Sequence, residues 1–435
     1  MVYELTQSIV FFVLKILSYF LPMSFKMKKF LQFKEDDNFL LSLAYAKRKQ
    51  NNKTVFWVHV SSAGELDLFI PIAEKLHEKF GAYFFLSYYS PSALPFVKNV
   101  PYLICHCGFP KDKKVLFMKA FKSLSIKKVF FVRYDIWPKF LEAAIASKVE
   151  CSLVSATISK KASLFSKFRE CLYFRAYRKL DNIFVVTKKD EQVFKKACPK
   201  SHVIFSGDSK WSRVVQKSLQ TKDRISKKVK NLSIELDALR KKRSLKILIF
   251  ASPHKDELEI LRQVTALKGF FFMCVPQEVE KASLAKLREN YIDQSLRVEY
   301  SSSSTNLKET DLLLVDEVGF LSQLYAYCDL AIVGGGFSGK PHNLIEPAVG
   351  GSAILVGDKL SRAPEAALLR EKNCLQAFQS QTKLMSYLKD LNKLIMLGEK
   401  EFLFKIKKDF ISQDDRKAFF ESLPRPEETI ASFLK

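Results

Sequence analysis

The sequence is poor in the residues from which metal centres and charge-relay triads are built. Its 435 residues include six histidines, no Asp-x-Asp pair and no G-x-S-x-G segment. These absences argue against a diphosphate held by a chelated metal, a zinc hydrolase and an α/β-hydrolase. We therefore expect no metal ion and no cofactor.

Cysteine is present but scattered. Most of the eight cysteines stand beside aliphatic or aromatic residues, as small buried hydrophobic side chains do. Cys105 and Cys107, which flank His106, form the only close pair, and no second pair of ligands completes a zinc site. The pattern indicates a reducing, cytoplasmic compartment.

Positive charge dominates the composition. Lys and Arg number 71 against 46 Asp and Glu, giving a net charge of +25. A charge of this size indicates an anionic partner, which by composition alone is nucleic acid, acidic lipid or a phosphorylated substrate.

The N-terminus is an apolar segment followed by lysines. Leu5–Leu21 is apolar almost all round a helix, is interrupted by Lys15, and lacks the basic n-region and cleavage site of a signal peptide. Its length favours a membrane-associating helix at the bilayer surface, with the following lysines against anionic headgroups on the cytoplasmic side. A core helix of the first domain is the alternative.

From residue 55 onward, short apolar runs alternate with helical segments, which predicts parallel sheets covered on both faces. The expected strands are 55–60, 82–88, 102–107, 128–134, 151–158, 182–187, 202–206, 245–251, 270–275, 296–300, 311–315, 330–333 and 353–356. We predict an α/β protein with two Rossmann-like domains facing a cleft, preceded by a membrane-associating segment. The expected parts are a segment at 1–30, domains at 31–215 and 245–410, a basic connection at 216–244 and a C-terminal helix at 411–435.

The first candidate site segment runs from Trp57 to Glu65, across the end of a strand and the start of a helix. Ser62 and Glu65 have the spacing of a capping box, which would be purely structural. Glu65 is alternatively a general base that takes a proton from an attacking hydroxyl. Spacing alone favours the capping box.

The second segment runs from Val132 to Pro138, again at the end of a strand. Pro138 suits a first helical turn, and Asp135 is near the N-cap position. Asp135 is therefore either a structural cap or a carboxylate that orients a substrate.

The third segment, from Ile332 to Pro347, carries an apolar strand into Gly334, Gly335 and Gly336 and then a short helix expected near His342. Glycines let backbone N–H groups approach a phosphate, and a helix N-terminus favours negative charge. Asn343 and Glu346 should share a helical face, from which a carboxylate can accept hydrogen bonds from ribose hydroxyls. A structural glycine turn would not need these polar residues, so we predict a phosphate and nucleotide site.

Two further segments repeat the arrangement of strand end, small residues and helix start. Ser252 and His254 could reach a phosphate, or could belong to an ordinary N-cap with acidic residues after it. Lys210, in Gly207–Trp211, could point into the cleft, although a lone lysine is more often a surface residue.

Taken in order, HVSSAGE, YDIWPKFL, GDSKW, ASPHKDELE and VGGGFSGKPHNLIEPA resemble the Kdo (3-deoxy-D-manno-octulosonic acid) transferases, which are GT-B glycosyltransferases of the lipopolysaccharide inner core. The resemblance runs from the N-terminus to about residue 370 and implies transfer of Kdo from CMP-Kdo to a phosphorylated lipid A precursor. It implies a location on the cytoplasmic face of the inner membrane and no nucleic-acid partner.

The resemblance also implies residue roles. Glu65 matches the catalytic base of the family, and Asp135 matches a second active-site acid. The glycine-rich loop with His342, Asn343 and Glu346 matches the cytidylate-binding region. Ser62, Gly64, Lys210, Ser252 and His254 belong to the same motifs and are expected to bind substrate or nucleotide.

The sequence departs from the family pattern at Arg133, Thr157, Gln277, Glu278 and Phe320. These departures concern acceptor and donor contacts rather than the fold. The alternatives are another membrane-associated GT-B transferase that uses a different nucleotide sugar, and a non-catalytic basic protein that binds nucleic acid or lipid.

Overall fold

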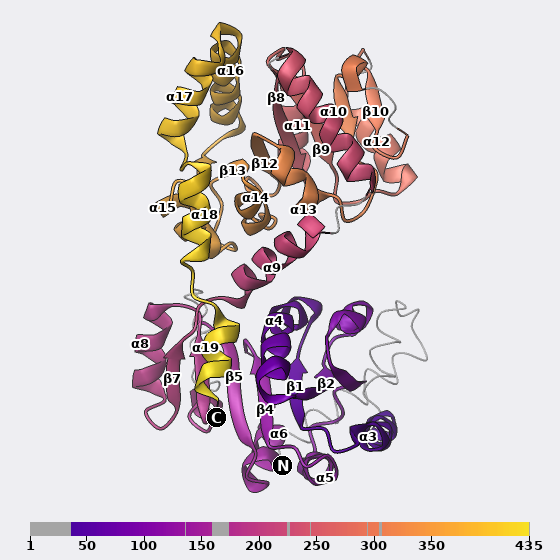
Figure 1. Ribbon diagram of the computed structural model, residues 1–435, viewed down its shortest axis with the longest axis vertical. Helices are drawn as coiled ribbons and strands as arrows, with labels where there is room; N and C mark the ends of the chain where they lie inside the picture. The colour runs from indigo at the N-terminus through magenta and orange to yellow at the C-terminus, as the bar shows by residue number, and fades with distance from the viewer. Residues whose placement is uncertain are drawn as a thin grey trace. The chain divides into compact units, whose positions relative to one another are not determined.

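The computed structural model describes residues 36–134, 136–158, 174–223, 227–243, 245–293, 295–303 and 307–434. They form two compact units, 36–213 with 423–434 and 214–422 (Figure 1). The predicted membrane-associating segment and Asp135 lie outside the described residues. Within the described ranges, no helix is long and apolar enough to cross a bilayer.

Seven parallel strands form the sheet of the first unit, in the order β3-β2-β1-β4-β5-β6-β7. Each lies at a segment where the sequence predicts a strand. All six residues of β1 are buried, as expected for a strand covered on both faces. The strands are β1 (Val55–Val60), β2 (Tyr83–Tyr88), β3 (Leu103–Gly108), β4 (Lys128–Val132), β5 (Glu150–Ala156), β6 (Asn182–Val185) and β7 (His202–Phe205).

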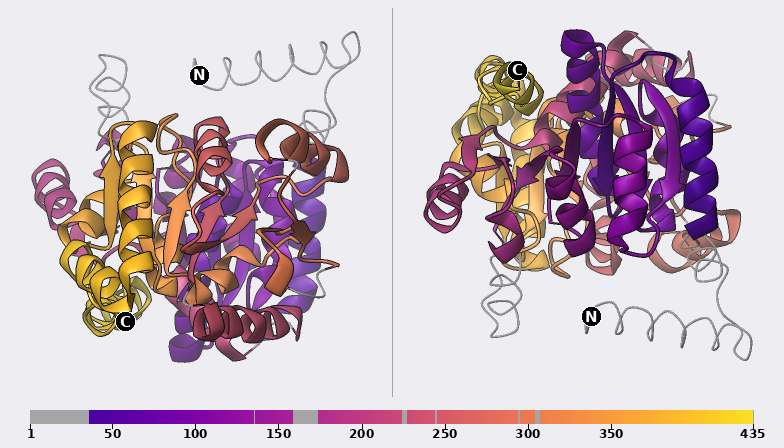
Figure 2. Two further views of the ribbon diagram at one scale, coloured as in Figure 1. Left: turned by 90° about the horizontal axis from the view of Figure 1, so that it is seen from above. Right: turned by 90° about the horizontal axis from the view of Figure 1, so that it is seen from below.

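Helices cover both faces of this sheet (Figure 2). Alternate side chains of β1 enter the two cores, Trp57 on one face and Val58 on the other. The face of Trp57 is covered by α3 (Asp36–Gln50), α5 (Lys114–Ser123), α6 (Pro138–Ala146) and α8 (Lys188–Ala197). The face of Val58 is covered by α4 (Ala63–Phe80), the 3-10 helix η1 (Pro91–Asn99) and α19 (Pro426–Phe433).

The second unit also has seven parallel strands, in the order β10-β11-β9-β8-β12-β13-β14. The last strand was not predicted, because its four residues include Gln376 and three of them are only partly buried. The strands are β8 (Lys246–Ala251), β9 (Phe270–Val275), β10 (Val298–Tyr300), β11 (Leu312–Leu314), β12 (Leu330–Val333), β13 (Ala353–Gly357) and β14 (Leu375–Phe378).

Two helical layers cover this sheet as well. Leu248 and Phe250 of β8 face α11 (Lys255–Val264), α12 (Lys281–Tyr291), α16 (Gln381–Leu397) and α17 (Glu399–Asp409). Ile247 and Ile249 face α10 (Lys227–Arg243), η2 (Leu307–Glu309), α13 (Leu321–Leu324) and η3 (Tyr325–Tyr327). The remaining helices are α9 (Ser209–Asp223), α14 (Ile345–Gly350), α15 (Glu365–Glu371) and α18 (Gln413–Glu421).

The basic stretch at 216–244, predicted as a connection, includes a helix with a buried face. Val229, Leu232, Leu236 and Leu239 of α10 are buried against the sheet of the second unit. Their spacing of three and four residues is that of one helical face. The many lysines on the other faces conceal this pattern in the composition.

The C-terminal stretch at 411–435 was expected to form one helix and instead forms two. α18 belongs to the second unit, whereas α19 belongs to the first and packs on α4. The Lys79 side chain of α4 donates to the Ala431 carbonyl at 2.6 Å.

In each sheet the strand order reverses between two inner strands, and the predicted site segments lie there; at the edge of the second sheet β10 and β11 are also exchanged. In the first unit β1 neighbours β4, so the loops after Val60 and Val132 begin side by side. In the second unit β8 neighbours β12, so the loops after Ala251 and Val333 begin side by side. Ligands of open parallel sheets bind at the carboxyl ends of strands flanking such a reversal.

Candidate functional site

Glu65 lies in the first turn of α4, directly after β1. Its carboxylate accepts a hydrogen bond from the Ser61 N–H at 2.5 Å, while the Ser62 hydroxyl makes no cap bond. The expected capping box is therefore not formed, because Glu65 reaches one residue further back, to the end of the strand. This bond fixes the carboxylate at the positive end of an 18-residue helix. A Cβ added at Gly64 would meet nothing within 4 Å, so packing does not require glycine there.

A buried histidine ties β1 to the loop before α6. The Trp137 indole donates to His59 Nε2 at 3.0 Å, and His59 Nδ1 lies 2.9 Å from the Ser87 hydroxyl. An indole N–H only donates, so Nε2 is the acceptor and Nδ1 carries the proton. Ser87 also accepts from Trp57 at 2.9 Å. The network fixes the second predicted segment against the first.

The N-terminus of α6 is capped from a distant loop. The Asp112 carboxylate accepts hydrogen bonds from the N–H groups of Lys139 at 3.0 Å and Phe140 at 2.9 Å. Pro138 occupies the first helical position, as predicted. Asp112 therefore caps the start of α6.

Charged groups from several loops surround Tyr134, the second residue after β4. Burial raises the pKa of Tyr134, the Arg133 charge opposes this rise, and the carboxylates of Asp190, Asp208 and Glu65 add to it. Glu65 follows β1 and Asp208 follows β7, so the carboxyl edge of the sheet gathers groups that are far apart in the sequence.

Lys210 lies in the first turn of α9, where its backbone N–H donates to the Asp208 carboxylate at 2.9 Å. The preceding Ser209 bonds to Ser155 of β5 through their hydroxyls at 2.9 Å. Lys210 is half-buried, rather than a fully exposed lysine.

In the second unit, the three glycines after β12 are required by close backbone packing. A Cβ on Gly334 would lie 1.9 Å from the Ser252 carbonyl oxygen, and one on Gly336 would lie 2.5 Å from the Gly357 nitrogen. Gly335 has φ +84°, and its Cβ would lie 2.1 Å from the Lys340 carbonyl oxygen. No larger residue fits at these three positions.

Two of the three glycine N–H groups are already bound within the protein. The Gly334 N–H donates to Ala251 at 2.9 Å, and the Gly335 N–H donates to the Glu257 carboxylate at 3.1 Å. The spacing of Gly334, Gly336 and Gly339 is that of a dinucleotide fingerprint, but no helix opens at this loop, since α14 begins at Ile345. The glycines shape the site by packing.

Glu257, which the sequence analysis did not single out, joins the two loops of the second unit. It is fully buried, and besides Gly335 it accepts from the His254 N–H at 3.0 Å. One carboxylate therefore stabilises both the start of α11 and the glycine loop. The sequence signal is the acid three residues after His254, which is the spacing of a capping box.

His254 and His342, 88 residues apart in the sequence, lie together. Their Nε2 atoms are 3.2 Å apart, and His254 Nδ1 lies 3.1 Å from the Ser338 hydroxyl. Burial lowers the pKa of His342, and the neighbouring His254 lowers it further. The structure thus brings together two side chains that were predicted separately as phosphate ligands.

The predicted pair of Asn343 and Glu346 is also in contact, through an amide-to-carboxylate hydrogen bond of 3.0 Å. α14 begins at Ile345 rather than near His342, so Asn343 precedes the helix. Its side-chain oxygen accepts from the Ile345 N–H at 3.0 Å. The contact is therefore made by a residue that ends the loop and one in the first helical turn.

Neither the thiols nor the pockets add a second site. Among the described residues, no group of three His, Cys, Asp or Glu could hold a metal ion. Burial raises the pKa of both Cys105 and Cys107, which keeps these thiols protonated. Cys105 donates to the Ser42 carbonyl at 3.4 Å.

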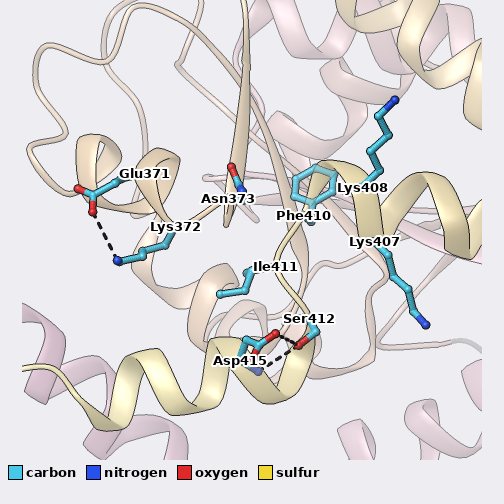
Figure 3. A pocket seen from close by; sticks show the side chains of 9 residues that line it. All are labelled: Glu371, Lys372, Asn373, Lys407, Lys408, Phe410, Ile411, Ser412 and Asp415. Atoms are coloured by element: carbon cyan, nitrogen blue, oxygen red, sulfur yellow. Dashed lines mark hydrogen bonds and ion pairs between the residues drawn. The ribbon is translucent and has the colours of Figure 1, made fainter.

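A pocket of about 570 Å³ in the second unit lies at Asn373, before β14, and thus away from the carboxyl ends of the strands. Figure 3 shows Lys407 and Lys408 directed away from Lys372 rather than converging. A pocket of about 450 Å³ in the first unit lies beside His202, the first residue of β7, and Phe433, also away from the carboxyl ends of the strands. We place the candidate site at the two strand reversals instead.

The fold defines the class as tandem doubly wound units of the GT-B kind. A solved UDP-N-acetylglucosamine 2-epimerase has a TM-score of 0.56 at 13% identity, covering 87% of this chain and 93% of that one. A glycosyltransferase from Rickettsia africae ESF-5 has a TM-score of 0.50 at 10% identity, covering 88% and 98%. At these identities the likeness concerns the fold alone.

Sequence comparison identifies the family. A model of 3-deoxy-D-manno-octulosonic-acid transferase (kdotransferase) matches residues 38–213. The 3-deoxy-D-manno-octulosonic acid transferase of Aquifex aeolicus (strain VF5) is 26% identical over 358 residues, which are 79% of this chain and 89% of that relative. Both comparisons support the Kdo transferase family for this chain.

Replacing Glu257 by Gln should destabilise the second unit by about 1–3 kcal/mol, because an amide cannot accept from both His254 and Gly335 with its NH₂ end facing one of them. Circular dichroism during denaturant unfolding is the suitable probe, since all three tryptophans lie in the first unit. Glu259→Gln on the same helix is the matched control. Equal free energies of unfolding for Glu257→Gln and Glu259→Gln would contradict the role of Glu257 in joining the two loops.

Acidification should reduce stability through His342. The pKa of its folded state is lowered, so as the pH falls below the ordinary histidine value of about 6.5 the unfolded chain takes up the proton first. The free energy of unfolding therefore falls with the pH until the pH reaches the pKa of His342 in the folded protein. The wild type should therefore lose more unfolding free energy than His342→Gln between pH 7.5 and 5, measured by circular dichroism. Parallel pH curves for the two proteins would refute this.

Proposed function

We propose that the chain transfers Kdo from CMP-Kdo to a phosphorylated lipid A precursor in lipopolysaccharide core biosynthesis, with inversion at the anomeric carbon. Family membership supports the sugar, and one structural observation supports the site. In each unit, the two predicted segments richest in polar candidates flank the strand reversal, where parallel sheets bind ligands.

Glu65 is the proposed base. It takes the proton of the acceptor hydroxyl, whose oxygen forms a bond to the anomeric carbon while the bond to cytidylate breaks and its electron pair leaves with the phosphate. The Ser61 N–H holds the carboxylate in place, in the first turn of α4. Asp135 keeps its proposed place as a second acid of the acceptor site, and Ser62, Gly64 and Lys210 line it.

The second unit is the proposed nucleotide site. His254, Ser252 and His342 offer donors to the phosphate, and Glu346, oriented by Asn343, accepts from ribose hydroxyls. Gly334, Gly335 and Gly336 allow the loops to pack closely enough to bring these groups together. We propose that imidazole donors stabilise the leaving monophosphate without a cofactor.

We propose that the protein works on the cytoplasmic face of the inner membrane. The net charge of +25 suits anionic headgroups, the carboxylate of Kdo and the phosphates of the acceptor. Nucleic acid is not a proposed partner, because the polar candidates gather at strand reversals typical of small-molecule sites.

Product mass tests the proposal. The purified full chain is incubated in detergent with CMP-Kdo and a tetra-acylated lipid A precursor, and the lipid is analysed by mass spectrometry. We expect a mass gain of one or more Kdo units. No gain while CMP still binds would require another acceptor, and no gain with UDP or GDP binding in place of CMP would require another donor.

Replacing Glu65 by Gln should lower the transfer rate by at least about 100-fold, because the amide cannot accept the hydroxyl proton. The side-chain oxygen still accepts from Ser61, so folding and CMP binding should be preserved. Glu78→Gln, on the exposed end of the same helix, is the control and should keep full activity. Unreduced transfer by Glu65→Gln would remove Glu65 from this role.

A further inference from the structure

Arg133 is the first residue after β4 and has a strained backbone. Its φ is +64°, in the left-handed region that non-glycine residues seldom adopt, and its N–H donates to the Val154 carbonyl of β5 at 2.9 Å. Strained residues of this kind concentrate at ligand-binding sites. The strained residue is Arg133 itself, at the carboxyl edge of the sheet of the first unit.

The Arg133 guanidinium lacks an acceptor among the described residues. Its Nε atom is buried without a hydrogen-bond partner. By contrast Arg213, a buried arginine of the same unit, pairs with Asp67 at 2.9 Å. A buried N–H donor without an acceptor is unfavourable, and native proteins retain few of them.

A second orphan donor lies at the start of the neighbouring loop. β1 pairs with β4 up to His59 and Phe131, so the loops that begin with Ser61 and Arg133 leave neighbouring strands at the same edge of the sheet. The Ser61 hydroxyl is also buried without a partner. Each of the two loops at the strand reversal therefore begins with a buried polar group that lacks an acceptor.

The nearby carboxylates are held by other groups. Asp190 accepts from Thr187 at 2.7 Å and from the Ile158 N–H at 3.0 Å, and Asp208 accepts from the Lys210 N–H. Glu65 accepts from the Ser61 backbone N–H. It makes no hydrogen bond with the Ser61 hydroxyl, which has no partner within the described ranges. No ion pair joins these acids to Arg133 in the described part of the chain.

We propose that Arg133, with the Ser61 hydroxyl, binds an anionic oxygen group of the substrate beside Glu65. A planar guanidinium suits a carboxylate or phosphate, since it can donate two parallel hydrogen bonds. The inference rests on the proposed function for its substrates. In that reaction two substrate groups are anionic and could bind Arg133: the carboxylate of the donor sugar and a phosphate of the acceptor.

Kinetics of Arg133→Gln separate the two sources. We expect the KM of one substrate to rise at least about tenfold with a smaller change in kcat, and Arg133→Lys to recover part of the loss. A rise for the lipid alone assigns the acceptor phosphate, and a rise for CMP-Kdo alone assigns the sugar carboxylate. Unchanged KM values for both substrates would overturn the proposal while leaving the transferase function intact.

Stability gives a readout that does not need activity. Removing a buried donor without an acceptor should leave the unfolding midpoint of Arg133→Gln unchanged or raise it, whereas a structural arginine would lower it. Inorganic phosphate should raise the melting temperature of the wild type and of Arg178→Gln, an exposed control, more than that of Arg133→Gln. Equal shifts, or no shift in the wild type, would refute the proposal even if no transfer is observed.

Discussion

The close approach of backbones at the strand reversal is the constraint on which the second unit depends. Gly334 packs on the Ser252 carbonyl, and Gly336 packs on Gly357. The backbones of the loops after β8 and β12 and of the end of β13 are therefore in direct contact. The Glu257 carboxylate joins two of these loops, because it accepts hydrogen bonds from an N–H group of each. Only because the backbones are this close can His254 and His342 touch across 88 residues of sequence. The glycines therefore matter first as spacers, and the polar side chains that they bring together carry the chemistry.

Periodicity was sufficient to predict most of the fold, because parallel strands covered on both faces are continuous apolar runs. β14 was missed since an edge strand of four residues with Gln376 lacks such a run. The basic stretch misled for a different reason: α10 needs only Val229, Leu232, Leu236 and Leu239 for its buried face, and mainly charged and polar residues occupy its other positions. The split of the C-terminal stretch into α18 and α19 depends on tertiary packing against α4, which no local pattern records.

At the site, sequence spacing identified candidate residues but not their partners. Ser62 and Glu65 have capping-box spacing, yet Glu65 binds the Ser61 N–H and the Ser62 hydroxyl makes no cap bond. The cap of α6 comes from Asp112, which is 27 residues before Lys139 and could not be paired with it from the sequence. Whether a polar residue is structural or available for chemistry is decided by such long-range contacts.

The two units hold different kinds of polar group, and this difference has a physical consequence. The edge of the first unit has a carboxylate fixed at a helix N-terminus, suited to accept a proton. The edge of the second unit has two imidazoles in contact, and burial together with His254 keeps His342 neutral to a lower pH. A bound phosphate favours the protonated imidazole, so phosphate binding and proton uptake are linked, and each strengthens the other. In the proposed reaction, departure of the phosphate leaving group would add negative charge beside His342. A proton held on His342 would then be favoured more strongly as the reaction proceeds than in the ground state.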